Sequence, residues 1–128
     1  LSVSGLDCQA RVTLSRNGTE SSGTAAGHSS RENLLRLTAS ATANALKRFL
    51  GEANWLLLED VVSLNLVKRE VVLVLLVLVT PQSSIELVGA AIVRRSLQEA
   101  TAAATLNAVN RYLSPLAGNG SEPAAEEG

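Results

Sequence analysis

The residues that come closest to a chemical motif lie at two points where a strand is expected to end and a helix to begin. One cluster consists of His28, Ser29, Ser30 and Arg31, and the other of Arg94, Arg95 and Ser96. The free amides at a helix start attract anions, and basic and hydroxyl side chains add further donors. The clusters therefore predict binding of a phosphate or carboxylate group. The alternative is that the serines only cap the helices, which is the commoner role of serine there.

The sequence contains few residues that could carry out catalysis or bind a metal ion. His28 is the only histidine and Cys8 the only cysteine, so an internal disulfide and a cysteine-based metal cluster are excluded. A hydrolytic triad would have to use His28 as its base, and no Gly-x-Ser-x-Gly turn accompanies it. Glu59 and Asp60 are adjacent, and neighbours on an extended segment point to opposite sides. We therefore expect no enzymatic activity, no cofactor and no metal.

Composition limits the classes of partner. Apolar residues make up 46% of the 128 residues, charged residues make up 18%, and the formal net charge is −1. This balance predicts one folded domain that does not bind nucleic acid. The longest apolar run, residues 71–79, is far shorter than the roughly 20 residues of a membrane helix, so no membrane insertion is expected. We expect a cytoplasmic setting and interpret the chain, which lacks methionine, as part of a longer protein.

An internal repeat organises the chain. Residues 41–50 match residues 104–113 without a gap, with six of ten positions identical. Shared alanines could arise from composition alone, but the shared asparagine and arginine could not. The sequences Ser29-x-x-Glu32 and Ser96-x-x-Glu99 both fit a capping box. They predict helices over residues 31–50 and 97–113, the first ending at Gly51 and the second at Ser114-Pro115.

Strands are predicted before each helix. They cover residues 1–6, 9–15 and 19–26 in the first half, and residues 61–67, 71–80 and 85–93 in the second. Asn17-Gly18 predicts a tight hairpin turn. The expected fold is α+β, with tandem duplicated βββα units at residues 1–51 and 52–116 that form one compact domain. Their antiparallel sheet would carry two helices on one face, and residues 117–128 would be a disordered tail or linker.

The tandem βββα layout is similar to that of the regulatory domain of 2-isopropylmalate synthases. This resemblance implies effector binding near a dimer interface, and it concerns layout only because the glycine-rich signature of that family has no counterpart here. The β-β-α order also resembles double-stranded RNA-binding domains, which use basic helix starts to recognise A-form RNA. The lysine cluster expected there is missing. Trp55 is expected to pack between the two copies, with Phe49 and Tyr112 in the core.

One strand suggests a function. Residues 71–79 are apolar on both alternating sets of positions, which is typical of a strand buried on both faces. Because two helices cover only one face of the sheet, the other face needs a second copy, another domain of the parent chain, or an apolar ligand. The predicted interface residues are Val72, Val74, Leu76, Leu78, Val88 and Ile92. We therefore expect a non-catalytic accessory or oligomerisation domain of a larger protein, which forms a homodimer through its sheet and has a regulatory role. The alternative is a module that binds a small anionic or apolar effector.

Overall fold

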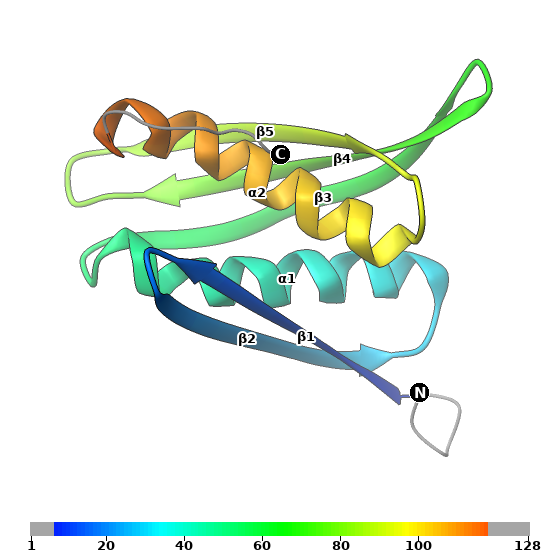
Figure 1. Cartoon of the computed structure of the whole chain (residues 1–128), viewed down its shortest axis with the longest axis horizontal. Helices are drawn as coiled ribbons and strands as arrows, with labels where there is room; N and C mark the ends of the chain where they lie inside the picture. The colour runs from blue at the N-terminus through cyan, green and yellow to red at the C-terminus, as the bar shows by residue number, and fades with distance from the viewer. Residues whose placement is uncertain (1–6, 118–128) are drawn as a thin grey trace.

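The computed structural model describes residues 7–117, and the side chains of residues 8–110. The chain is α+β, with antiparallel sheets and two helices (Figure 1). The elements are β1 (Asp7–Arg16), β2 (Thr19–His28), α1 (Arg31–Leu50), β3 (Trp55–Leu66), β4 (Arg69–Val79), β5 (Ser84–Ile92) and α2 (Leu97–Ala117). The strand predicted over residues 1–6 and the tail beyond residue 117 lie outside the described residues.

The strands form two sheets, so the prediction of one sheet was wrong. β1 pairs with β2, and β3, β4 and β5 form a second sheet in that order. Figure 1 shows α1 between the β1–β2 hairpin and the larger sheet, and α1 contacts β1, β2 and β3. α2 contacts β4, β5 and α1. The physical reason is that α1 buries residues around most of its circumference, which suits a helix placed between two layers.

The β1–β2 turn is the predicted hairpin. Asn17 and Gly18 both have positive φ, at 53° and 81°, and they connect Arg16 directly to its partner Thr19. Asparagine and glycine are the residues that adopt this conformation at low cost. The local sequence therefore sets the register of β1 against β2.

The helix starts and ends follow local signals, with two corrections. α1 is capped by Ser30, whose hydroxyl accepts a hydrogen bond from the Asn33 amide at 3.1 Å, and not by Ser29 as predicted. It ends at Gly51, which has a φ of 95°. α2 runs past Pro115 to Ala117, further than predicted. A proline within a helix removes one hydrogen bond and crowds the carbonyl group four residues earlier, so it weakens the last turn without fixing the residue at which the helix ends.

Each helix lies unusually close to a strand at a glycine. A Cβ placed on Gly23 of β2 would lie 2.1 Å from the Ala41 carbonyl oxygen, and one on Gly89 of β5 would lie 2.0 Å from the Ala104 carbonyl oxygen. No side chain fits at either position. Alanines of both helices, among them Ala41 and Ala104, thus lie where the helices meet the strands.

The hydrogen bond beside Gly23 also has a counterpart beside Gly89. The Asn44 side-chain amide donates to the Thr24 carbonyl at 3.0 Å, and that of Asn107 donates to the Ala90 carbonyl at 2.8 Å. Each accepting residue directly follows one of the two glycines. The two asparagines that match in sequence therefore make equivalent bonds from helix to strand.

Candidate binding surfaces

The two faces of the three-stranded sheet are both rich in apolar residues but differ in exposure. The side chains of Val72, Val74, Leu76 and Leu78 face the helices and are fully buried. Their assignment to an interface was wrong, because the helices of their own protomer cover them. Val88 and Ile92 lie on the opposite face and are 53% and 38% exposed.

The face of this sheet that points away from the helices is an apolar surface, and we call it the outer face. Leu75 of β4 lies directly opposite Val88 of β5, so the two share this face. The side chains of β4 on this face are partly exposed, and those of β3 are more so. Its apolar members are Leu57, Val62, Leu64 and Leu66 of β3, Val71, Leu73, Leu75, Val77 and Val79 of β4, and Val88 and Ile92 of β5.

Charges lie at the margins of the outer face. Glu86 is on the edge strand β5, opposite Val77. Asp60 is on the other edge strand, β3, opposite Leu75 at an irregularity of the strand, and it forms an ion pair with Arg36 of α1 at 3.5 Å. The central strand begins with Arg69 and presents an uncharged outer surface from Val71 to Val79.

Trp55 does not pack between the halves as predicted. It is 59% exposed, and the Lys47 ammonium lies 5.7 Å from the centroid of its ring. This distance is within the range of a cation–π contact. Trp55 begins β3 opposite Val79, at one corner of the outer face.

The smaller sheet presents a polar surface to solvent. Gln9, Arg11 and Thr13 of β1 are exposed, and the Thr13 hydroxyl lies 2.9 Å from that of Ser22 on β2. This is the alternation typical of a sheet with one buried and one hydrated face. The two sheets thus differ in chemistry on the sides that face away from the helices.

The predicted anion sites lie at the same end of the molecule, where both helices begin (right in Figure 1). Ser30 caps α1, and the Ser96 hydroxyl accepts from the Glu99 amide at 3.0 Å. Arg31 forms an ion pair with Glu70, and Arg95 with Glu99 at 3.8 Å. Local partners thus engage both serines and both arginines, and anion binding there stays a prediction.

The other residues of these clusters lie nearby. The His28 carbonyl accepts a hydrogen bond from the Asn33 side-chain amide at 2.9 Å. Ser29 is partly buried between β2 and α1, and Arg94 is exposed after β5. None of these contacts brings the two clusters into one site.

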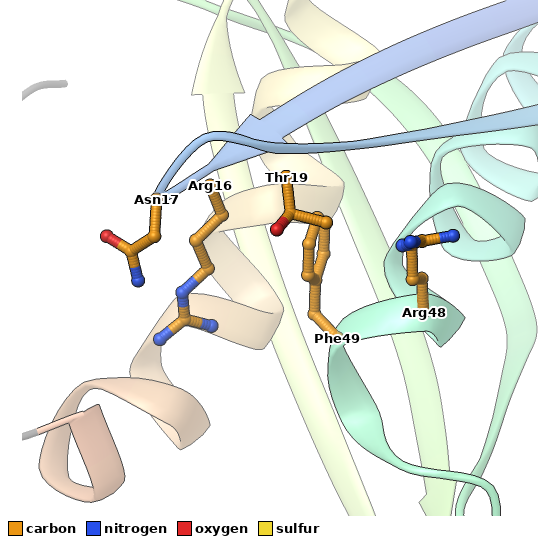
Figure 2. Close-up of a pocket in the computed structure, with 5 residues that line it drawn as sticks. All are labelled: Arg16, Asn17, Thr19, Arg48 and Phe49. Atoms are coloured by element: carbon orange, nitrogen blue, oxygen red, sulfur yellow. The ribbon is translucent and has the colours of Figure 1, made fainter.

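An arginine pair lies at the opposite end of α1. Figure 2 shows Arg16 and Arg48 on either side of the Phe49 ring, with Thr19 beside it. These residues and Asn17 line an open cavity of about 440 Å³. Neither arginine has an acidic partner among the described residues. Arg16 falls on the inward-facing positions of β1, which otherwise carry Val12 and Leu14. This break in an apolar alternation is the sequence signal by which the site could have been found.

A groove lies between β1, α1 and α2. Its cavity measures about 390 Å³, and its apolar part includes Val12, Leu34 and Ala102. Thr38 also lines it, is 3% exposed, and has a hydroxyl group without a hydrogen-bond partner among the described residues. Such a buried polar group is costly unless something pairs with it.

Metal and membrane features are lacking in the described part of the chain. It contains no group of three or more histidine, cysteine, aspartate or glutamate residues placed to hold a metal ion. It also contains no helix long and apolar enough to cross a membrane.

No protein-family model matches the chain, and no curated protein matches it. A function can therefore be argued only from the surfaces described above.

Proposed function

We propose that this chain is a non-catalytic association domain that forms a homodimer through its outer face. The observation that carries the proposal is the contrast between the two sheets. One turns a polar surface to water, whereas the other turns a continuous row of valine and leucine side chains to water. Large exposed apolar patches of this kind mark sites of association.

The size of the outer face suits a dimer. β4 has 11 residues, each rising about 3.3 Å, and three strands spaced about 4.8 Å apart make a face of roughly 14 by 35 Å. Two such faces would bury on the order of 1,000 Å² in total. This is close to the smallest area expected of a specific interface, which is about 1,000 Å².

A second copy is the occupant that the chemistry favours. A symmetric contact places each residue near the same residue of its partner, so like charges at the centre would oppose it. Leu75 lies at the centre of β4 with only apolar neighbours on that strand, whereas Glu86 lies on the edge strand β5. Asp60 lies opposite Leu75 on the other edge strand, β3, where Arg36 pairs with its charge. Two sheets can pack face to face at about 10 Å with such side chains between them.

Sedimentation equilibrium of three proteins tests this proposal. The wild-type chain should dimerise, and Leu75→Glu should raise the dissociation constant at least about tenfold, because two carboxylates would be buried near each other. Thr13→Glu places the same charge on the exposed side of the polar sheet and should leave the constant unchanged. A wild type that stays monomeric at high micromolar concentration would contradict the proposal.

We also propose that the two halves are copies of one βββα unit. The gapless sequence match, the paired glycines and the paired asparagine bonds support it. Thr42 and Thr105 add a further correspondence, since each donates to the carbonyl oxygen of the threonine four residues earlier. Divergence after duplication would then account for one polar and one apolar sheet surface.

A second candidate function is binding of a small phosphorylated ligand at the arginine pair. Arg16 is a partly buried residue whose guanidinium group has no carboxylate partner in the described part of the chain, and such a group favours an anion. The Asn17 amide and the Thr19 hydroxyl line the same cavity and can donate further hydrogen bonds. The Phe49 ring offers an apolar surface to the rest of a ligand.

Titration with inorganic phosphate and pyrophosphate, followed by arginine side-chain NMR signals, tests this second function. Arg16→Gln and Arg48→Gln should each weaken binding about tenfold or more, as expected for the loss of a charge-assisted bond. Arg11→Gln, on the exposed side of β1, is the matched control and should bind like the wild type. Equal weakening by all three variants would indicate non-specific attraction instead.

A further inference from the structure

The outer edge of β5 is a place where the three-stranded sheet could pair with a strand of another chain. Among the described residues, β5 pairs only with β4, so one of its edges faces away from the sheet. The Val93 amide donates to the Glu70 carbonyl oxygen of β4 at 2.8 Å. The backbone groups of an antiparallel pair point to the partner at every second residue, so those of Ala90 point away from β4. An edge of this kind is a template for strand addition.

Asn107 of α2 occupies this edge. Its side-chain amide donates to the Ala90 carbonyl oxygen at 2.8 Å, and it therefore takes the position from which the backbone amide of an added strand would bond. α2 lies directly against β5 beside this bond, since a Cβ on Gly89 would lie 2.0 Å from the Ala104 carbonyl oxygen. The asparagine thus closes the part of the edge that the helix passes.

The opposite edge of the sheet, on β3, is closed by a carboxylate. By the same alternation the Val61 amide points away from β4, and it donates to the Asp60 carboxylate at 2.8 Å. Asp60 also pairs with Arg36 of α1, and the ladder with β4 is irregular between Leu58 and Asp60. Charged side chains and bulges are means by which natural sheets prevent pairing at their edges.

The smaller sheet has the same asparagine contact at a strand that is also an edge among the described residues. The Asn44 amide donates to the Thr24 carbonyl of β2 at 3.0 Å. Asn44 and Asn107 are one of the matches between the two helices that an alanine-rich composition does not explain. A shared task at strand edges gives a physical reason for this match.

We infer that Asn107, together with Asp60 at the opposite edge, confines self-association of this chain to the outer face. Copies then pair face to face and do not join edge to edge into longer sheets. The inference rests on the proposed dimer and extends it, because an apolar sheet with open edges can grow into assemblies that do not close.

A peptide that can act as an added strand tests the role of Asn107. A fluorescent peptide with the sequence of β5, Ser84–Ile92, is titrated into the wild type, Asn107→Ala and Asn110→Ala, and binding is followed by fluorescence anisotropy. Asn107→Ala should bind the peptide at least about tenfold more tightly than the wild type, because the Ala90 carbonyl oxygen becomes available to a strand.

Asn110→Ala is the matched control for this experiment. Asn110 is also exposed on α2, and its side chain makes no hydrogen bond to the strands that the structure describes. This variant should bind the peptide like the wild type. Equal affinities of the wild type and Asn107→Ala would overturn the inference.

The Leu75→Glu background separates the edge from the outer face. The tighter binding caused by Asn107→Ala should persist there, because the peptide contacts the edge of β5. A gain that disappears in this background would show that the peptide binds the outer face, and it would also overturn the inference. A monomeric wild type would contradict the dimer, whereas the peptide titration would still decide whether Asn107 closes the edge.

Discussion

Two glycines determine how closely each helix approaches its sheet. The helix backbone occupies the space that a side chain on Gly23 or Gly89 would need, so the contact is between backbone and backbone. Alanines on the helices permit this approach from the other side. The spacing of the layers therefore depends on residues that have almost no side chain.

Gly89→Ala should lower the free energy of unfolding by about 1–3 kcal/mol, because the new methyl group would force α2 away from β5. Gly27→Ala is the control, since its Cβ would lie 3.4 Å from the nearest atom of Leu37, an ordinary contact. Urea denaturation measures both variants. Equal stability of the two variants would contradict this account of the close approach.

Val67 is the residue whose backbone conformation fits its type least well. It has a positive φ and is fully exposed, so no packing offsets the strain of a β-branched residue there. Val67→Asn should raise the free energy of unfolding by about 1 kcal/mol, because asparagine adopts this conformation more readily. A lower melting temperature for this variant would show that Val67 makes a stabilising contact.

Strand β4 illustrates what a sequence pattern can and cannot predict. Its nine-residue apolar run correctly indicated a strand, but it predicted burial on both faces, and the structure fully buries only one. Because both alternating sets of positions are apolar, the pattern could not tell which set faces the helices. That choice depends on the register with β3 and β5, which involves distant residues. The predicted interface accordingly included four residues that form the core.

Leu76→Glu should unfold the protein, in contrast to the outer-face variant of its neighbour Leu75. Leu76 is fully buried beneath the helices, and a carboxylate there would have no partner. Circular dichroism should show loss of helix signal for Leu76→Glu and a native spectrum for Leu75→Glu. The reverse result would mean that the two faces have been assigned wrongly.

Elements with local signals were predicted well, and contacts between elements were not. The Asn17-Gly18 turn and the bounds of α1 depend on residues next to them, and both were confirmed. The position of α1 between two sheets depends on packing with β3, which no short pattern encodes. The break that Arg16 makes in the apolar alternation of β1 was a usable signal, but only the completed fold shows that Arg48 lines the same cavity.

At the scale of the whole molecule, α1 lies between the β1–β2 hairpin and the three-stranded sheet, and α2 contacts α1 and covers β4 and β5 (Figure 1). The polar sheet is hydrated on its outer side, whereas the apolar sheet ends the molecule with an uncovered surface. Pairing of two copies through that surface would extend the layers symmetrically and place the arginine pairs away from the contact. The proposed dimer thus leaves the second candidate site free.

The most direct test of the dimer is an isotope-filtered NOE experiment on an equimolar mixture of labelled and unlabelled chains. It detects contacts between protomers only, and methyl groups of Leu73, Leu75 and Val88 provide the reporters. The proposal predicts cross-protomer NOEs among these methyl groups and none to Leu76, which the helices cover. A dimer whose NOEs come from other surfaces, or the absence of any cross-protomer NOE at millimolar concentration, would contradict it.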